Sequence, residues 1–135
     1  MDLQDRLRER AASLPEVKLA VLFGSTARGQ VRKGSDVDLG LLLDPDTRPV
    51  RLHVEAELGR AAARETDVIY LNEAPPLLRF EISRDGVVIL ERDEGLWTGF
   101  KARAMVDWWD WAPYAKRIEE AAIRRLREKV AHGQA

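Results

Sequence analysis

Residues 36–43 constrain the fold more than any other stretch of the chain. Alternate positions from Val37 to Leu43 are all apolar, and Asp36 and Asp38 lie among the intervening positions. Side chains of a β-strand alternate between the two faces of its sheet, so this stretch predicts a strand with one fully apolar face and two carboxylates together on the other. Such a strand needs a sheet whose apolar face is covered by other elements.

The rest of the chain alternates between strand patterns and helix patterns. Further strands are predicted where apolar, β-rich runs occur, at residues 17–23, 66–71 and 87–90. Helices are predicted where residues favour a helix by spacing or propensity, at residues 2–14, 50–64 and 75–84 and beyond residue 93. We expect residues 1–135 to form a single α/β or α+β domain, with a small mixed β-sheet flanked by helices and a long C-terminal helical segment.

Composition excludes several classes of protein. The 22 Lys and Arg residues nearly balance the 23 Asp and Glu residues, for a net charge of -1, so any contact with nucleotide or nucleic acid must come from a local site. The absence of cysteine excludes disulfides and thiolate metal sites. No run approaches the roughly 18 apolar residues of a membrane span, and the first residues lack the apolar core of a signal peptide, so we expect a cytoplasmic protein.

An apolar stripe follows the predicted C-terminal helix. Its residues recur at steps of three and four, and they are Trp97, Phe100, Ala104, Trp108, Trp111, Ala115, Ile118, Ala122 and Leu126. Pro113 should kink or restart the helix because proline lacks the backbone N–H of a helical hydrogen bond. Neighbouring residues of a helix point about 100° apart, so Trp108 and Trp109 cannot both lie at the centre of the stripe. We expect Trp109 to pack against the sheet or the first helix, with contact to a partner protein as the alternative.

The last part of this helix is basic. Between residues 116 and 129, six lysines and arginines stand against three glutamates. This excess suits an acidic partner surface or RNA, and it equally suits a solvated helix face with pairs of opposite charge four residues apart.

Asp36 and Asp38 are the first candidates for chemistry. Residues two apart on a strand have Cα atoms about 6.6 Å apart and face the same way, so both carboxylates address one site. Like charges at this spacing repel each other unless a cation, an arginine or water compensates them. Hard oxygen ligands without His or Cys suit Mg²⁺ or Mn²⁺, and two such ions about 4 Å apart would match the span of the pair. A solvated strand end explains the pair equally well.

A glycine-serine turn precedes this strand. Gly24 lies where the first predicted strand ends, and a glycine there allows backbone N–H groups and the Ser25 hydroxyl to approach a phosphate closely. An ordinary strand-to-helix junction with Ser25 as its N-cap is the alternative. Gly24 and Gly29 have the spacing of a P-loop. Residues 30–31 are Gln-Val where that motif requires Lys followed by Ser or Thr, which excludes it.

Together these residues form a known signature. Gly24-Ser25, followed after ten residues by Asp36-Val37-Asp38, is the GS-x10-D-x-D motif, and with it the chain resembles the DNA polymerase β-like nucleotidyltransferase superfamily. Within it, the chain looks like the minimal nucleotidyltransferase (MNT-domain) antitoxins, through its short length, the turn at residues 24–29, the segment at residues 67–75 and the aromatic C-terminal helix. The resemblance covers nearly the whole chain and implies a polymerase β-like nucleotidyltransferase fold.

The resemblance also implies roles for individual residues. Asp36 and Asp38 would bind the Mg²⁺ or Mn²⁺ ions that hold the substrate ATP, and Gly24 with Ser25 would hold its distal phosphates. By position, Asp67 at the start of the third predicted strand would complete the catalytic metal site.

Two of the implied assignments have competitors. Glu65 would replace Asp67 if the register of that strand slipped by two residues, and we favour Asp67. Arg28, three residues after Ser25, would reach the triphosphate, and a solvent-facing arginine is an equal alternative.

The resemblance further implies a partner, a HEPN-type ribonuclease toxin whose tyrosine such antitoxins adenylylate with ATP. HEPN nucleases carry an R-x4-6-H-x-Y motif. Residues 127–132 supply its Arg and His, but Gln134 stands in the tyrosine position. We therefore expect this chain to be the transferase half of a toxin-antitoxin pair, a protein adenylyltransferase.

Two other functions stay open at this point. A degenerate transferase would neutralise the toxin only by binding it and covering its active site. A different acceptor, such as a small molecule or RNA, would keep the enzyme, but relatives of that kind usually add a second substrate-binding domain, for which 135 residues leave no room.

Overall fold

The computed structural model describes residues 1–27 and 36–133. Its helices and strands, in chain order, are α1 (Leu3–Ala12), β1 (Val17–Phe23), α2 (Gly24–Ala27), β2 (Val37–Leu43), α3 (Arg48–Ala62), β3 (Thr66–Tyr70), α4 (Pro76–Asp85), β4 (Val87–Glu91) and α5 (Leu96–Ala131). Every strand and long helix predicted from the sequence is present, with ends that differ by a few residues at most.

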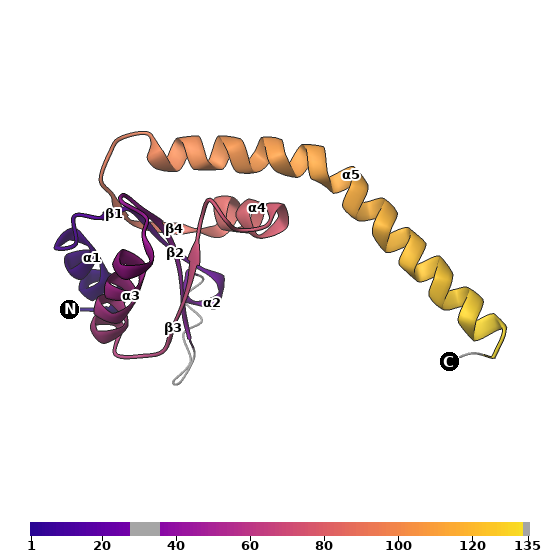
Figure 1. Cartoon of the computed structure of the whole chain (residues 1–135), viewed down its shortest axis with the longest axis horizontal. Helices are drawn as coiled ribbons and strands as arrows, with labels where there is room; N and C mark the ends of the chain where they lie inside the picture. The colour runs from indigo at the N-terminus through magenta and orange to yellow at the C-terminus, as the bar shows by residue number, and fades with distance from the viewer. Residues whose placement is uncertain (28–35, 134–135) are drawn as a thin grey trace.

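Strands β3, β2, β1 and β4 lie side by side in that order in one mixed sheet (Figure 1). β1 runs antiparallel to both of its neighbours, β2 and β4, whereas β2 and β3 are parallel and are joined by α3. A parallel pair needs such a crossover because the chain must return to the same end of the sheet before the second strand begins. The predicted mixed sheet with flanking helices is confirmed.

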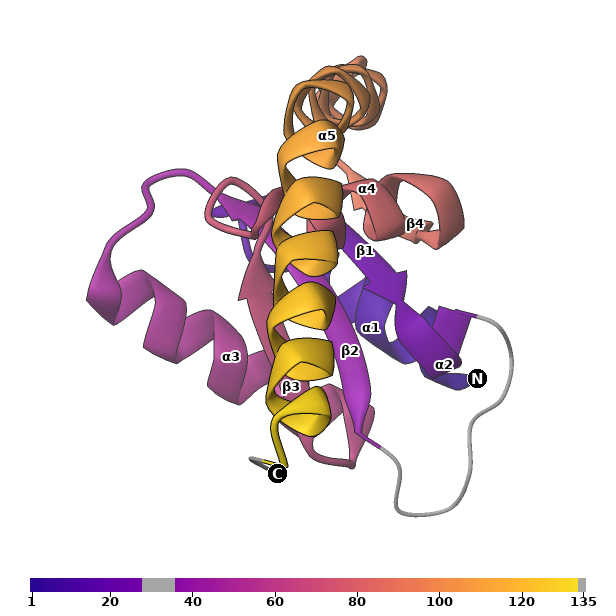
Figure 2. The same cartoon turned by 90° about the vertical axis from the view of Figure 1, so that its right-hand side faces the viewer.

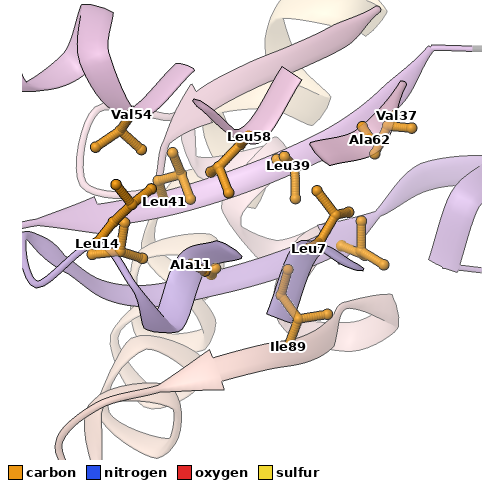
Figure 3. Close-up of a cluster of buried hydrophobic side chains, with 13 residues drawn as sticks. Leu7, Ala11, Leu14, Val37, Leu39, Leu41, Val54, Leu58, Ala62 and Ile89 are labelled. Carbon is orange, nitrogen blue, oxygen red and sulfur yellow. The ribbon is translucent and has the colours of Figure 1, made fainter. Parts of the chain in front are cut away.

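Helices α1 and α3 cover one face of the sheet, and the first hydrophobic core lies between them and β2 (Figure 3). The apolar face of β2 contributes Val37, Leu39 and Leu41, which are all fully buried. Leu7 of α1 and Leu58 of α3 belong to the same buried cluster. The apolar strand face predicted from residues 36–43 is therefore confirmed.

The opposite face of the sheet is covered by α4 and the first half of α5. A second core forms there and contains Leu71, Ile82 and Phe100. β2 approaches this core through Gly40, where a Cβ would lie 2.5 Å from the Leu71 Cδ2 atom, so a larger residue would not fit. The carboxylates of β2 and β3 lie beyond this core, at the end of the sheet where β1 stops and β2 and β3 begin.

Arginine side chains hold the ends of two helices. The Arg92 guanidinium, which follows β4, donates to the carbonyl oxygens of Leu14 at 3.1 Å and Ala11 at 3.2 Å. Arg6 donates to the Ala61 carbonyl oxygen at 3.0 Å, in the last turn of α3. Carbonyls at the end of a helix have no partner within the helix and carry partial negative charge, so a cation stabilises them.

Helix α5 is 36 residues long and bends part-way along its length (Figures 1 and 2). Pro113 lies inside it, and the missing N–H of proline accounts for the bend, so the helix is kinked and does not restart. The half before the bend packs on α4 and β4, with Phe100 and Ala104 buried. Neither α5 nor any other helix in the described part of the chain is apolar enough over sufficient length to cross a membrane.

The position of Trp109 corrects an expectation. Predicted to pack against the sheet or the first helix, it is 66% exposed. Its neighbour Trp108 takes the inward position and stacks on Phe80 of α4, with ring centroids 5.3 Å apart. One further residue along a helix turns the side chain by about 100°, which directs Trp109 into solvent.

Candidate functional site

Gly24 ends β1 and begins α2. Its φ of +66° lies in the left-handed region that favours glycine. A Cβ at this position would lie 2.5 Å from a carboxylate oxygen of Asp38, so any side chain here would collide with Asp38 and also strain the backbone. Glycine therefore suits the backbone conformation and leaves the Asp38 carboxylate in its position beside the turn.

Asp38 and Asp67 lie side by side on the parallel strands β2 and β3, whose register pairs them directly. Phe23, the last residue of β1, is the partner of Asp38 on its other side. Asp38 is partly buried and Asp67 is exposed. The strand order thus brings two of the three predicted carboxylates together, next to Gly24.

The electrostatics of Asp38 reflect this arrangement. Partial burial raises the pKa of its carboxyl above the ordinary value, and the negative charges of Asp67 and Asp36 raise that pKa further. Asp36 is exposed and immediately precedes β2, close enough for its charge to act on Asp38. All three predicted carboxylates therefore share one electrostatic environment, and we call them the carboxylate cluster.

The carboxylate cluster has the donor chemistry of a site for a hard divalent cation. It offers oxygen atoms only, and the repulsion that adds to the effect of burial on the pKa of Asp38 is of the kind that a bound cation relieves. Within residues 1–27 and 36–133, no three His, Cys, Asp or Glu side chains are arranged in advance around a common point for an ion. The cluster fits Mg²⁺ in its chemistry, and its role as a ligand set stays a prediction.

The register favours Asp67 over its competitor Glu65. Glu65 precedes β3, and its backbone carbonyl accepts a 2.9 Å hydrogen bond from the Val37 N–H. Asp67 is the residue that pairs with Asp38. The predicted register of β3 is therefore present, without the slip by two residues that would have placed Glu65 there.

Two predicted phosphate-binding groups lie outside the described part of the structure. Ser25 belongs to α2 and directly follows Gly24, but its side chain is not among the described groups. Arg28 is outside the described residues altogether. Their contacts with a triphosphate stay predictions.

A hollow of about 260 Å³ adjoins the Gly24 turn. It is lined by apolar and charged groups from the end of β1 and from α4, namely Phe23, Gly24, Leu78, Glu81, Ile82, Arg84 and Asp85. The Arg84 guanidinium is held by the Asp85 carboxylate at 2.8 Å. Sequence reasoning missed this wall of the site, although apolar Leu78 and Ile82 recur at helical spacing among charged residues, which is the signal that could have revealed it.

A comparison with protein families identifies this arrangement. The family model described as polymerase beta, nucleotidyltransferase matches residues 5–95, a segment that includes Gly24 and the whole carboxylate cluster. The chain belongs to this nucleotidyltransferase family. The predicted superfamily is confirmed, and the match ends one residue before α5 begins.

This nucleotidyltransferase is similar to a protein adenylyltransferase in sequence and to chains of toxin-antitoxin complexes in fold. The protein adenylyltransferase MntA of Aphanizomenon flos-aquae (strain 2012/KM1/D3) is 25% identical over 124 residues, which cover 84% of this chain and 80% of the relative. A chain in the crystal structure of a toxin-antitoxin with AMP-PNP has a TM-score of 0.75 at 18% identity, over 89% of this chain and 98% of its own. A chain from the complex of a tri-AMPylated Shewanella oneidensis HEPN toxin with MNT antitoxin has a TM-score of 0.68 at 17% identity, over 89% and 98% of the two chains. The predicted resemblance to the MNT antitoxins is confirmed.

A second polar cluster of the nucleotidyltransferase lies at the other end of β2. The Arg51 guanidinium pairs with the carboxylates of Asp46 and Glu73, each at 2.6 Å, and lies 3.7 Å from the centre of the Tyr70 ring. The Tyr70 hydroxyl donates a 2.8 Å hydrogen bond to Glu55, and burial together with this bond raises the pKa of Tyr70. Sequence reasoning missed this cluster because Arg51 and Glu73 are 22 residues apart. It ties α3 to the end of β3.

Proposed function

We propose that this nucleotidyltransferase uses Mg²⁺ to transfer AMP from ATP to a tyrosine hydroxyl of a HEPN-type ribonuclease toxin, and so acts as its antitoxin. The observation that carries the proposal is the pairing of Asp38 with Asp67 beside Gly24. The similarity to an adenylyltransferase, to a chain solved with AMP-PNP and to a chain in complex with an AMPylated HEPN toxin supports the choice of nucleotide and acceptor.

The carboxylate cluster would hold the metal. Mg²⁺ held by Asp36, Asp38 and Asp67 would neutralise the triphosphate charge and lower the pKa of the acceptor hydroxyl. Gly24 and Ser25 would hold the distal phosphates where β1 passes into α2. The absence of a Cβ at Gly24 leaves the Asp38 carboxylate room directly beside this turn.

The proposed transfer is a displacement at the α-phosphorus of ATP. The tyrosine oxygen forms a bond to the α-phosphorus of ATP, the bond from that phosphorus to the leaving oxygen breaks, and pyrophosphate departs with the electron pair. The phenol proton passes to a carboxylate. In this proposal Asp67 accepts it, and the exposure of Asp67 on the edge strand β3 beside Asp38 supports that role.

Replacing Asp36 and Asp38 together by Asn tests the proposal. The variant should no longer transfer label from α-³²P-ATP, in the presence of Mg²⁺, to the proposed partner, a HEPN-type toxin. Asn keeps the size of each side chain but removes the charge that holds the metal. The matched control, Asp93→Asn with Glu94→Gln, removes two exposed charges between β4 and α5 and should label the partner normally.

Several outcomes of this experiment are decisive. Label transfer by the Asp36 and Asp38 variant at the rate of the parent would overturn the assignment of the carboxylate cluster. Loss of label with continued protection of cells from the toxin would show that binding alone neutralises the toxin. Mass spectrometry of the co-expressed parent pair should find AMP increments on a tyrosine of the partner, and their absence would contradict the proposed acceptor.

A further inference from the structure

The part of α5 around and beyond its bend projects away from the sheet and the other helices (Figures 1 and 2). We call residues 109–131 the distal helix. Beyond Pro113, its large apolar side chains are between 43% and 65% exposed, and they are Tyr114, Ile118, Ile123, Leu126 and Val130. Large apolar groups that are exposed together along one helix mark a site of interaction.

The apolar stripe of α5 is continuous across the bend. Before the bend, Phe100 and Ala104 belong to the second core and are buried. Trp111, Ala115 and Ile118 continue the stripe at the same steps of three and four residues, yet Ile118 is 61% exposed. The half of the stripe before the bend is thus covered by other elements of this chain. The half beyond the bend has the same apolar pattern but is exposed.

The exposed apolar residues of the distal helix occupy more than one face. Ile118 follows Trp111 by seven residues, two turns, so these two share a face. Ile123 follows Ile118 by five residues and therefore points about 140° away from it. Trp109 precedes Trp111 by two residues and points about 160° away from that face, toward the side of Ile123. A single neighbouring helix covers a stripe only about 100° wide, so this surface fits a groove that encloses the helix.

The cations of the distal helix indicate where a complementary groove should carry acidic groups. Arg125 and Lys129 follow Ile118 and Ala122 by seven residues each, so the face of the stripe ends in two cations. At the start of the distal helix, a groove of about 370 Å³ between α4 and α5 is lined by Pro76, Arg79, Asp107, Asp110, Trp111 and Tyr114. There, Arg79 and Asp107 already pair with each other at 2.9 Å. The complementary surface therefore needs apolar walls throughout and carboxylates where it meets Arg125 and Lys129.

We propose that the distal helix is the docking surface for the HEPN-type partner, and that it lies in an apolar groove of that protein with acidic groups at one end. The identity of the partner rests on the proposed function. The carboxylate cluster lies within residues 5–95, which match the family model, and the distal helix lies outside them. Docking and group transfer therefore reside in separate parts of the chain and can be tested separately.

A second copy of this chain fits the surface less well. Two distal helices packed along their stripes would bury Trp111 and Ile118 but leave Trp109 and Ile123, on the other side, in water. Like charge also opposes self-association, because residues 109–131 contain six Lys and Arg against four Asp and Glu.

The test compares two double variants of the full-length chain. Ile118→Glu with Leu126→Glu places carboxylates on the stripe, and Arg117→Gln with Arg124→Gln makes the same change in net charge on the opposite face. Binding to the proposed partner, a HEPN-type toxin, is measured by isothermal titration calorimetry. We expect the stripe variant to bind about 100-fold more weakly than the parent, and the control to stay within about threefold. Circular dichroism and ATP binding should be unchanged in both, because neither depends on the packing of these exposed side chains.

The possible results separate docking from transfer. Parent-like affinity of the stripe variant, or no binding by the parent itself, would overturn the docking surface. A dimer of the parent alone in analytical ultracentrifugation that the stripe variant abolishes, with partner binding intact, would assign the surface to a second copy and also overturn the proposal. If the parent binds the partner through the stripe but never labels it, the docking surface stands and the proposed transfer fails.

Discussion

The two ends of β2 carry acidic clusters of opposite construction. We call the C-terminal end of β2 the far end and its N-terminal end the near end. At the far end, Arg51 lies between Asp46 and Glu73, and its hydrogen bonds and charge lower the pKa of both carboxyls. At the near end, partial burial raises the pKa of Asp38, and the negative charges of Asp67 and Asp36 raise it further. At the far end a guanidinium of the chain bridges the two acids, whereas at the near end the described effects of neighbouring charges on Asp38 are repulsive.

This difference distinguishes a cluster suited to a structural role from one suited to binding a ligand. Acids that pair with an arginine stabilise the fold by tying segments together, as Arg51 ties α3 to the segment after β3. Acids that repel each other cost stability, and a fold tolerates that cost where a bound ligand relieves the repulsion. The contrast therefore predicts that substitutions at the near end impair ligand binding and transfer, whereas those at the far end change stability and its pH dependence without impairing transfer.

Of the substitutions considered, Gly24→Ala at the near end should have the largest effect on stability and transfer. A non-glycine residue with left-handed backbone costs about 1–2 kcal/mol, and the new Cβ must also displace the Asp38 carboxylate oxygen that lies 2.5 Å away. We expect the free energy of unfolding to fall by about 2 kcal/mol and the transfer activity to be lost. Urea denaturation measures the first effect and label transfer from ATP the second.

Gly95 provides the matched control for this substitution. Its φ is +92°, also in the left-handed region, but nothing lies within 4 Å of the position of a Cβ. Gly95→Ala should therefore lower stability through the backbone alone and leave transfer intact. Equal activities of the two alanine variants would contradict the role given to Gly24.

Arg51→Met should have a smaller effect, on the pH dependence of stability at the far end. In the parent, Asp46 and Glu73 have lower pKa values in the folded than in the unfolded state. Their contribution to stability is therefore complete above the unfolded pKa values and is lost as the pH falls through the folded ones. Methionine removes the cation that lowers the two pKa values. The variant therefore lacks this contribution to stability, so it has less stability to lose when the pH falls.

Thermal unfolding at a series of pH values from about 6 to 2 measures this effect. The Tm of the parent should fall more steeply on acidification than the Tm of the Arg51→Met variant. If Tm falls equally with pH in the two proteins, the Arg51 guanidinium does not stabilise the far end, and the proposed difference between the two ends of β2 is wrong.

The local parts of the architecture were predictable from sequence. The alternation in residues 36–43 predicts β2 and its buried face, because a strand with one covered face requires only an apolar period of two. The GS-x10-D-x-D resemblance predicted the fold and the family, and both are confirmed. The adjacency of Asp38 and Asp67 depends on parallel pairing across α3, which no local pattern encodes, and the resemblance supplied it.

The remaining features depend on contacts between distant segments. The meeting of Arg51 with Glu73 and the wall that α4 places beside Gly24 arise only once the sheet is assembled. Trp109 shows the same limit for a helix. Helical spacing predicts a stripe along α5, but it does not show that α4 covers only the first half and leaves the residues beyond Pro113 in solvent.

The central claim is that a divalent cation binds at the near end of β2. Mn²⁺ broadens the NMR signals of nuclei close to it, so titrating the ¹⁵N-labelled full-length chain with Mn²⁺ and ATP locates the ion. We predict broadening of amide signals in residues 37–40 and 66–69, little effect in residues 44–55, and loss of the broadening in the Asp36→Asn, Asp38→Asn variant. Broadening centred on residues 44–55, or broadening that persists unchanged in that variant, would contradict the claim.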